Sequence, residues 1–146
     1  MKITEVKNRN KDLIDCLLEI WENTVRVTHL FLSNSEIENI KPYALQALNE
    51  VSHLLIIENE DNTPLGFMGI NGTKLEMLFI KSDERKKGLG KELLLYGIKK
   101  YNINELTVNE QNPLAKNFYE HMRFKVYKRL NLDEQGKPYP ILIMKL

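Results

Sequence analysis

The stretch DERKKGLGKELL, residues 83–94, places a cluster of cations and two glycines at the expected start of a helix. A helix start leaves about four backbone N–H groups unpaired and carries roughly half a positive charge. Gly88 and Gly90 have no side chain, so a phosphate group can approach these amides directly. Local positive charge comes from Arg85, Lys86, Lys87 and Lys91. The pattern indicates a phosphate-binding turn, and the alternative is a charged, solvated turn.

Two common nucleotide-binding motifs do not fit this stretch. A P-loop requires Ser or Thr after its Gly-Lys pair, but Glu92 follows Lys91. A dinucleotide-binding fingerprint requires a third glycine three places after Gly90, where Leu93 stands. Any phosphate ligand must therefore be held by a different motif.

Hydrophobic periodicity predicts the elements that position this turn. Strands are expected at 1–6, 53–58, 64–70, 74–80, 105–109, 125–133 and 140–146. Helices are expected from a cap at Asp12 to Val25, at 88–101 and at 113–122. Pro42 is expected to divide the segment 33–51 into a short turn and a helix that starts near the proline.

The resulting order is β-α-α-β-β-β-α-β-α-β-β. Helices inserted among mostly adjacent strands predict an α/β fold, of the α+β type, with a mixed sheet and helices on both faces. A length of 146 residues suits one domain, residues 1–146, with a substantial core.

Composition narrows the classes of function. Lys and Arg total 21 against 20 Asp and Glu, so the net charge of +1 argues against nucleic acid as a partner. No apolar stretch has the length of a membrane span, and no signal-peptide core precedes the first strand, which favours a cytoplasmic protein without a membrane partner. Cys16 is the only cysteine, so no internal disulfide is possible.

Two motifs together resemble the GNAT superfamily of N-acetyltransferases, in particular its small single-domain bacterial members. LFIKSDERKKGLGKELL is similar to motif A, whose pattern Arg/Gln-x-x-Gly-x-Gly/Ala is met by Arg85, Gly88 and Gly90. NEQNPLAKNFYEHMRF is similar to the next signature, at positions Asn112, Ala115, Phe118, Tyr119 and Phe124. The signature's glycine is replaced by Arg123. The resemblance implies a GNAT-like, mostly antiparallel twisted sheet of about six to seven strands.

The resemblance also implies that acetyl-CoA is the cosubstrate and that no metal is needed. Its pyrophosphate would lie on the amides of residues 86–91, and its pantetheine arm would pair with the strand 74–80 beside a slot opened by a bulge. The cofactor-binding residues implied are Leu78, Phe79, Ile80, Arg85, Lys86, Lys87, Gly88, Leu89, Gly90, Lys91 and Asn112.

By the same resemblance, a primary amine attacks acetyl-CoA directly, through a tetrahedral intermediate whose oxyanion faces an amide near Leu78. Tyr119 is the expected general acid that protonates the leaving thiolate. A lysine-like amine has a pKa of about 10.4, so its neutral form costs roughly 4–5 kcal/mol at pH 7. A base is therefore expected, with Glu76 first and Glu110 second.

By the same resemblance, the segment between the first two helices forms the acceptor pocket, with His29 in it and Tyr139 reaching it from the last hairpin. A non-catalytic acyl-CoA-binding module is the alternative function, because a fold does not fix an activity. Neither the amine nor the choice between monomer and homodimer can be read from the sequence.

Overall fold

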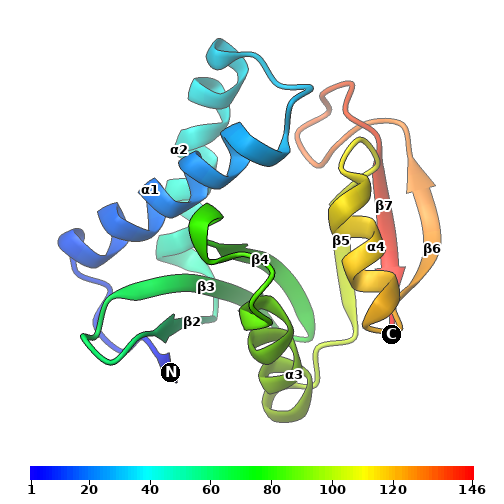
Figure 1. The fold of residues 1–146 in the computed structure, drawn as a ribbon. Helices are drawn as coiled ribbons and strands as arrows, with labels where there is room; N and C mark the ends of the chain where they lie inside the picture. Colours follow the sequence, from blue (N-terminus) through cyan, green and yellow to red (C-terminus); the bar gives the residue numbers. More distant parts are fainter.

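The computed structural model describes residues 1–146 as one seven-stranded sheet with four helices and a short 3-10 turn (Figure 1). In chain order the elements are β1 (Lys2–Glu5), α1 (Lys11–Thr28), α2 (Asn34–Glu50), β2 (His53–Glu58), β3 (Pro64–Asn71), β4 (Lys74–Ile80), η1 (Ser82–Glu84), α3 (Leu89–Tyr101), β5 (Glu105–Asn109), α4 (Pro113–His121), β6 (Lys125–Leu130) and β7 (Ile141–Lys145). The predicted order of helices and strands and the mixed sheet are confirmed.

The sheet has the strand order β1-β2-β3-β4-β5-β7-β6 and is antiparallel except between β4 and β5. β4 and β5 pair only at Lys74 with Glu105 and at Leu75 with Leu106. A bulge also shifts the β3–β4 register between Gly69 and Ile70, which leaves one extra residue in β4. The two central strands therefore separate after their first residues, as the family resemblance implies.

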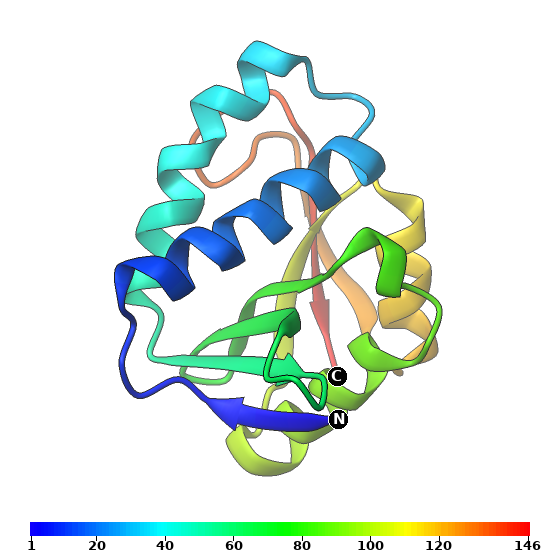
Figure 2. The ribbon, with the colours of Figure 1, turned by 60° about the vertical axis from the view of Figure 1, so that its left-hand side comes forward.

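The four helices cover opposite faces of the sheet (Figure 2). On one face α1 and α2 pack on the sheet around Leu17, Leu48 and Phe67, all fully buried. On the other face Leu93 of α3 and Phe124, which directly precedes β6, belong to a second core against which α4 packs. None of the helices has both the length and the apolar character needed to cross a membrane.

The predicted starts of the first two helices were wrong. α1 begins at Lys11 because Asn10, not Asp12, accepts a hydrogen bond from the backbone of Leu13. α2 is continuous through Pro42, because a capping box between Ser33 and Glu36 starts the helix two turns before the proline. Pro42 is exposed, so the carbonyl that loses its helical partner can bond water.

Arg123 adopts the left-handed conformation that glycine serves in the family signature. Its φ angle is 74°, and the next residue, Phe124, donates its backbone N–H to the carbonyl of Tyr119. This bond closes the end of α4 as in a glycine-terminated helix. The departure from the signature thus preserves the turn at the cost of an unfavourable backbone angle.

Replacing Arg123 with glycine is expected to stabilise the protein by about 0.5–1 kcal/mol, since relief of the left-handed strain exceeds the added flexibility of the unfolded chain. Thermal unfolding should then shift upward by about 2–4 °C. His121→Gly, inside the last turn of α4, is the matched control and should lower stability by about 1 kcal/mol. A lower unfolding temperature for Arg123→Gly than for the wild type would contradict the claim that Arg123 is strained.

The carboxylate of Glu5, in β1, connects this strand to β2 and α3 by hydrogen bonds. It accepts hydrogen bonds from Nδ1 of His53 at 2.8 Å and from the Tyr101 hydroxyl at 2.9 Å. The bond from His53 is the main reason that the pKa of Glu5 is lowered to about 2, with Tyr101 and Lys7 contributing against the opposite effect of burial. Because the folded-state pKa lies below the unfolded value, the stabilisation is complete above about pH 4.5. It is lost as the pH falls toward 2.

Glu5→Gln should therefore lower the free energy of unfolding by about 1 kcal/mol at pH 7, after allowance for solvent screening. The variant should also lose less stability than the wild type between pH 4.5 and pH 2. Denaturant unfolding at several pH values measures both effects. Glu60→Gln, at an exposed carboxylate without a partner, should change neither. Equal acid sensitivity of wild type and Glu5→Gln would rule out this linkage.

Candidate active site

The loop between β4 and α3 presents a row of free backbone amides. The N–H groups of residues 85–91 have no backbone acceptor, and the first bond into α3 runs from Glu92 to the carbonyl of Gly88. Gly88 caps the helix with a φ of 83°, and Lys86 has a φ of 64°. Unpaired amides at the positive end of a helix form a site suited to an anion.

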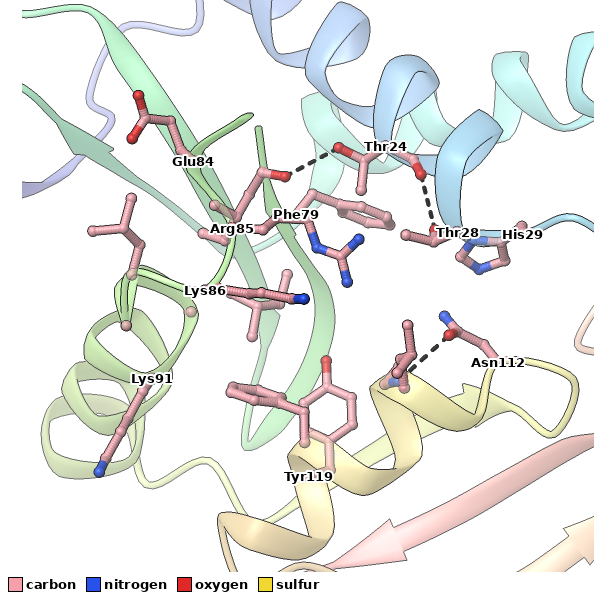
Figure 3. A pocket seen from close by; sticks show the side chains of 18 residues that line it. Thr24, Thr28, His29, Phe79, Glu84, Arg85, Lys86, Lys91, Asn112 and Tyr119 are labelled. Carbon is pink, nitrogen blue, oxygen red and sulfur yellow. Dashed lines mark hydrogen bonds between the residues drawn. The ribbon is translucent and has the colours of Figure 1, made fainter. Parts of the chain in front are cut away.

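The predicted cations differ in where they point. Arg85 and Lys86 extend into the cavity beside this loop, and Lys91 lies at its edge with its ammonium directed away (Figure 3). None of these three forms an ion pair. Lys87 lies outside the cavity and pairs with Glu84 at 2.9 Å. Two side chains, rather than four, are thus positioned to meet a ligand inside the cavity.

The cavity has a volume of about 410 Å³ and is built from five elements. Its lining comes from the end of α1, the strand β4, the free-amide loop, the start of α3 and the helix α4. Cationic side chains and free amides line it together with the apolar side chains of Leu78, Phe118 and Ala115, and its one carboxylate, Glu84, is paired with Lys87. A long ligand with a phosphate end and an apolar stretch, as coenzyme A has, fits this distribution.

A slot of about 200 Å³ continues the cavity between β4 and β5. The backbone N–H of Lys81 donates to Leu65 of β3, so alternate residues of β4 face β3 and the amides of Leu78 and Ile80 face away from it. Consistently, the Ile80 carbonyl accepts a hydrogen bond from the Thr24 hydroxyl of α1. β4 thus presents an unpaired edge to the slot, as an added strand requires.

Tyr119 lies where the cavity meets the slot. Its ring is held by edge contacts with Phe118 and Phe124, at centroid distances of 5.2 Å and 6.1 Å. Its hydroxyl takes part in no hydrogen bond within the chain, is not a fully buried atom, and points toward β4 (Figure 3). Burial raises the pKa of Tyr119 well above its usual value of 10. The phenol therefore stays protonated and is free to donate.

Asn112 lies across the cavity and caps α4. Its side-chain oxygen accepts from the backbone of Ala115 at 3.4 Å, and the residue is 8% exposed. Its side-chain nitrogen forms no hydrogen bond to the chain and is available to a ligand.

The two predicted bases are placed differently. Glu76 is the extra residue of the β4 bulge and lines the slot, 3.7 Å from the ammonium of Lys74. Glu110 lies outside the cavity and the slot, where it accepts two hydrogen bonds from Arg129. Those bonds lower the pKa of Glu110. Of the two carboxylates predicted as bases, Glu76 lies in the slot and Glu110 does not.

His29 and Tyr139 do not share one pocket. His29 lines both the cavity and the slot, whereas Tyr139 lines a separate hollow of about 220 Å³ beside the β6–β7 hairpin. Phe31 connects them, with ring centroids 5.5 Å from His29 and 5.9 Å from Tyr139. The hollow shares Thr107 with the slot, so it forms a second approach from the surface to the slot.

Several lining residues were not predicted from the sequence, among them two threonines and a phenylalanine at and after the end of α1. Thr24 and Thr28 stand one helical turn apart on α1 and face the cavity, and Phe31 follows in the next loop. A pair of threonines at i and i+4 on an otherwise apolar helix face was the signal available. The structure contains no group of three or more His, Cys, Asp or Glu side chains arranged to hold a metal.

Comparison with known proteins agrees with this geometry. The family model described as an acetyltransferase (GNAT) domain matches residues 17–137. The peptidyl-lysine N-acetyltransferase YjaB of Salmonella typhimurium is 37% identical over 126 residues, which cover 86% of each chain.

Solved structures show the same similarity. The solution structure of apo-form YjaB from Escherichia coli has a TM-score of 0.87 and 34% identity, covering 99% of this chain and 97% of that one. PaiA N-acetyltransferase from Thermoplasma acidophilum, in complex with coenzyme A, has a TM-score of 0.70 and 25% identity over the full length of both chains. This chain therefore belongs to the GNAT superfamily of N-acetyltransferases.

Proposed function

We propose that this protein transfers the acetyl group of acetyl-CoA to the side-chain amine of lysine residues in proteins or peptides. The observation that carries the proposal is a cavity lined by free amides, Arg85 and Lys86 that adjoins a slot along β4, with Tyr119 lining both. The choice of lysine rests on the name of the YjaB relatives, peptidyl-lysine N-acetyltransferase.

In this proposal, the free-amide loop and its cations bind the diphosphate of coenzyme A. The free amides of residues 86–91 and the side chains of Arg85 and Lys86 supply fixed hydrogen-bond donors and positive charge for a diphosphate. Lys91 adds charge at the rim. Asn112 offers its amide nitrogen to the arm of the cofactor.

In this proposal, the slot positions the arm of the cofactor and stabilises the negative charge that develops on the thioester oxygen. The outward-facing amides of Leu78 and Ile80 allow an extended arm to pair with β4, with Phe79 packed on the opposite face. The amide near Leu78 then meets the thioester oxygen, where charge develops when the amine attacks. A preformed donor of this kind requires no rearrangement during the reaction.

Tyr119 is the proposed general acid. It lies at the junction of cavity and slot, and its phenol remains protonated because burial raises its pKa. It can donate to the thiolate that leaves when the tetrahedral intermediate collapses. The acceptor amine approaches from the other side, where the hairpin hollow opens toward the slot at Thr107 and Asn109.

Two measurements test the proposal. Calorimetric titration with acetyl-CoA should give saturable binding at micromolar concentrations, with dephospho-CoA and free acetate as comparisons. Lysine-containing peptides, free lysine, polyamines and an N-terminal amine peptide should then be compared by release of free thiol. Peptide lysine should be the preferred acceptor. Binding without thiol release from any amine would favour the alternative, a non-catalytic acyl-CoA-binding module.

A further inference from the structure

The imidazole of His29 is held in one orientation at the end of α1. His29 ends that helix, and its backbone N–H donates to the carbonyl of Val25. On the ring, Nδ1 lies 2.8 Å from the Thr28 hydroxyl, and Phe31 packs against one side. A backbone bond, a side-chain bond and an aromatic contact together leave the ring little freedom.

The hydroxyl of Thr28 determines which ring nitrogen carries the proton. That hydroxyl lies 2.8 Å from the carbonyl of Thr24, which can only accept, so its single hydrogen is directed there. The contact between Thr28 and His29 is then a hydrogen bond only if Nδ1–H donates to the hydroxyl oxygen. This tautomer leaves Nε2 of His29 unprotonated, with its lone pair available.

The available nitrogen belongs to a ring that lines both the cavity and the slot, opposite Asn112 and Tyr119 (Figure 3). Burial lowers the pKa of His29 to about 4, with no contribution from a charged neighbour. The charged side chains on the walls of the cavity and the slot, Glu76, Glu84, Arg85, Lys86 and Lys91, form no bond to the ring. His29 is therefore neutral at physiological pH and presents an acceptor where the slot begins.

We infer that Nε2 of His29 accepts the proton of the attacking amine, which makes His29 a catalytic residue of the acetyl transfer proposed above. The amine nitrogen forms a bond to the acetyl carbon while one of its protons moves to Nε2. The carbon–sulfur bond then breaks, and the thiolate takes the proton of Tyr119. The imidazolium returns its proton through solvent to the phenolate, so the net reaction moves one proton from amine to thiol.

The carboxylates are less suited to this step. Glu110 is bound to Arg129 outside the cavity, and Glu76 lies beside the ammonium of Lys74. Both carboxylates are therefore already engaged by a cation, Glu110 by Arg129 and Glu76 by Lys74. His29 has no such partner, and its lone pair lies on the wall that the incoming amine must pass.

Three substitutions test the inference in steady-state assays with acetyl-CoA and a lysine peptide. His29→Asn keeps a donor for Thr28 but removes the atom at Nε2, and it should lower kcat about 100-fold. The dissociation constant of acetyl-CoA should change less than about threefold. Thr28→Val removes the hydroxyl that fixes the tautomer and should give a smaller loss, about fivefold to tenfold. His121→Asn, at an exposed histidine outside the cavity, is the matched control and should match the wild type.

Rescue by imidazole distinguishes the loss of a proton acceptor from damage to the structure of the site. His29→Ala should regain at least about tenfold in rate as imidazole is added, whereas Tyr119→Phe and the wild type should not respond. A rate for His29→Asn within about threefold of the wild type would overturn the role of His29 but not the proposed acetyl transfer. Loss of activity in His29→Ala without any rescue would also overturn it. A wild type that binds acetyl-CoA but acetylates no amine would overturn the proposed function and His29's role with it.

Discussion

Replacing Tyr119 with phenylalanine should lower kcat by about 100-fold to 1,000-fold while acetyl-CoA binds as before. The change removes one oxygen atom that lines the cavity and makes no hydrogen bond within the chain, so neither the fold nor the cavity should alter. The ring contacts with Phe118 and Phe124 remain. The variant lacks the proton donor for the leaving thiolate. A positioned general acid typically accelerates an enzymatic reaction by about 10²–10⁴-fold.

The measurement is thiol release under saturating acetyl-CoA, combined with a calorimetric titration of each variant. Tyr127→Phe is the matched control, because Tyr127 lies 66% exposed on the edge strand β6, far from the cavity lining. It should retain wild-type turnover. Because burial raises the pKa of Tyr119, activity of the wild type should show no loss from phenol ionisation below pH 10. A Tyr119→Phe enzyme that turns over normally would remove Tyr119 from the mechanism.

Introducing a carboxylate at Gly90 should abolish binding of acetyl-CoA without unfolding the protein. A side chain at this position has room, since its Cβ would meet the ring of Phe118 no closer than 3.6 Å. An aspartate in the first turn of α3 also interacts favourably with the helix dipole. The same carboxylate stands at the free amides and repels a diphosphate, at about 4 kcal/mol for a charge pair 4 Å apart near a surface. The dissociation constant should rise at least about 100-fold.

Gly90→Asn separates charge from size. Asparagine matches aspartate in volume and carries no charge, so its dissociation constant for acetyl-CoA should rise less than about tenfold. Thermal unfolding should confirm that both variants are folded. Equal weakening by Asn and Asp would mean that bulk, and not charge, excludes the cofactor, and would count against an anion site built on amides.

The fold and the free-amide loop before α3 could be predicted because their signals are local. Gly88 and Gly90 beside Arg85 mark a helix start, and the alternation of the strands follows from period-two hydrophobicity. Proline is a weaker local signal. Pro42 lies inside α2 because the capping box at Ser33 and the apolar face of the helix outweigh one lost hydrogen bond.

The far side of the site could not be predicted because it depends on three-dimensional neighbours. Tyr139 reaches His29 only through Phe31, and the engagement of Glu110 arises from the pairing that brings Arg129 beside it. The bulge that makes Glu76 the extra residue of β4 also leaves no mark in the alternation of residues 74–80. Such contacts between distant segments appear only once the sheet is assembled.

Mass spectrometry of a lysine peptide after incubation with acetyl-CoA and the protein observes the proposed reaction directly. We expect one acetyl group on the lysine side chain, formed at a rate that depends on both substrates. The product should be absent with Gly90→Asp and strongly reduced with Tyr119→Phe. An unmodified peptide, at protein and acetyl-CoA concentrations that saturate the cavity, would contradict lysine acetylation as the function of this site.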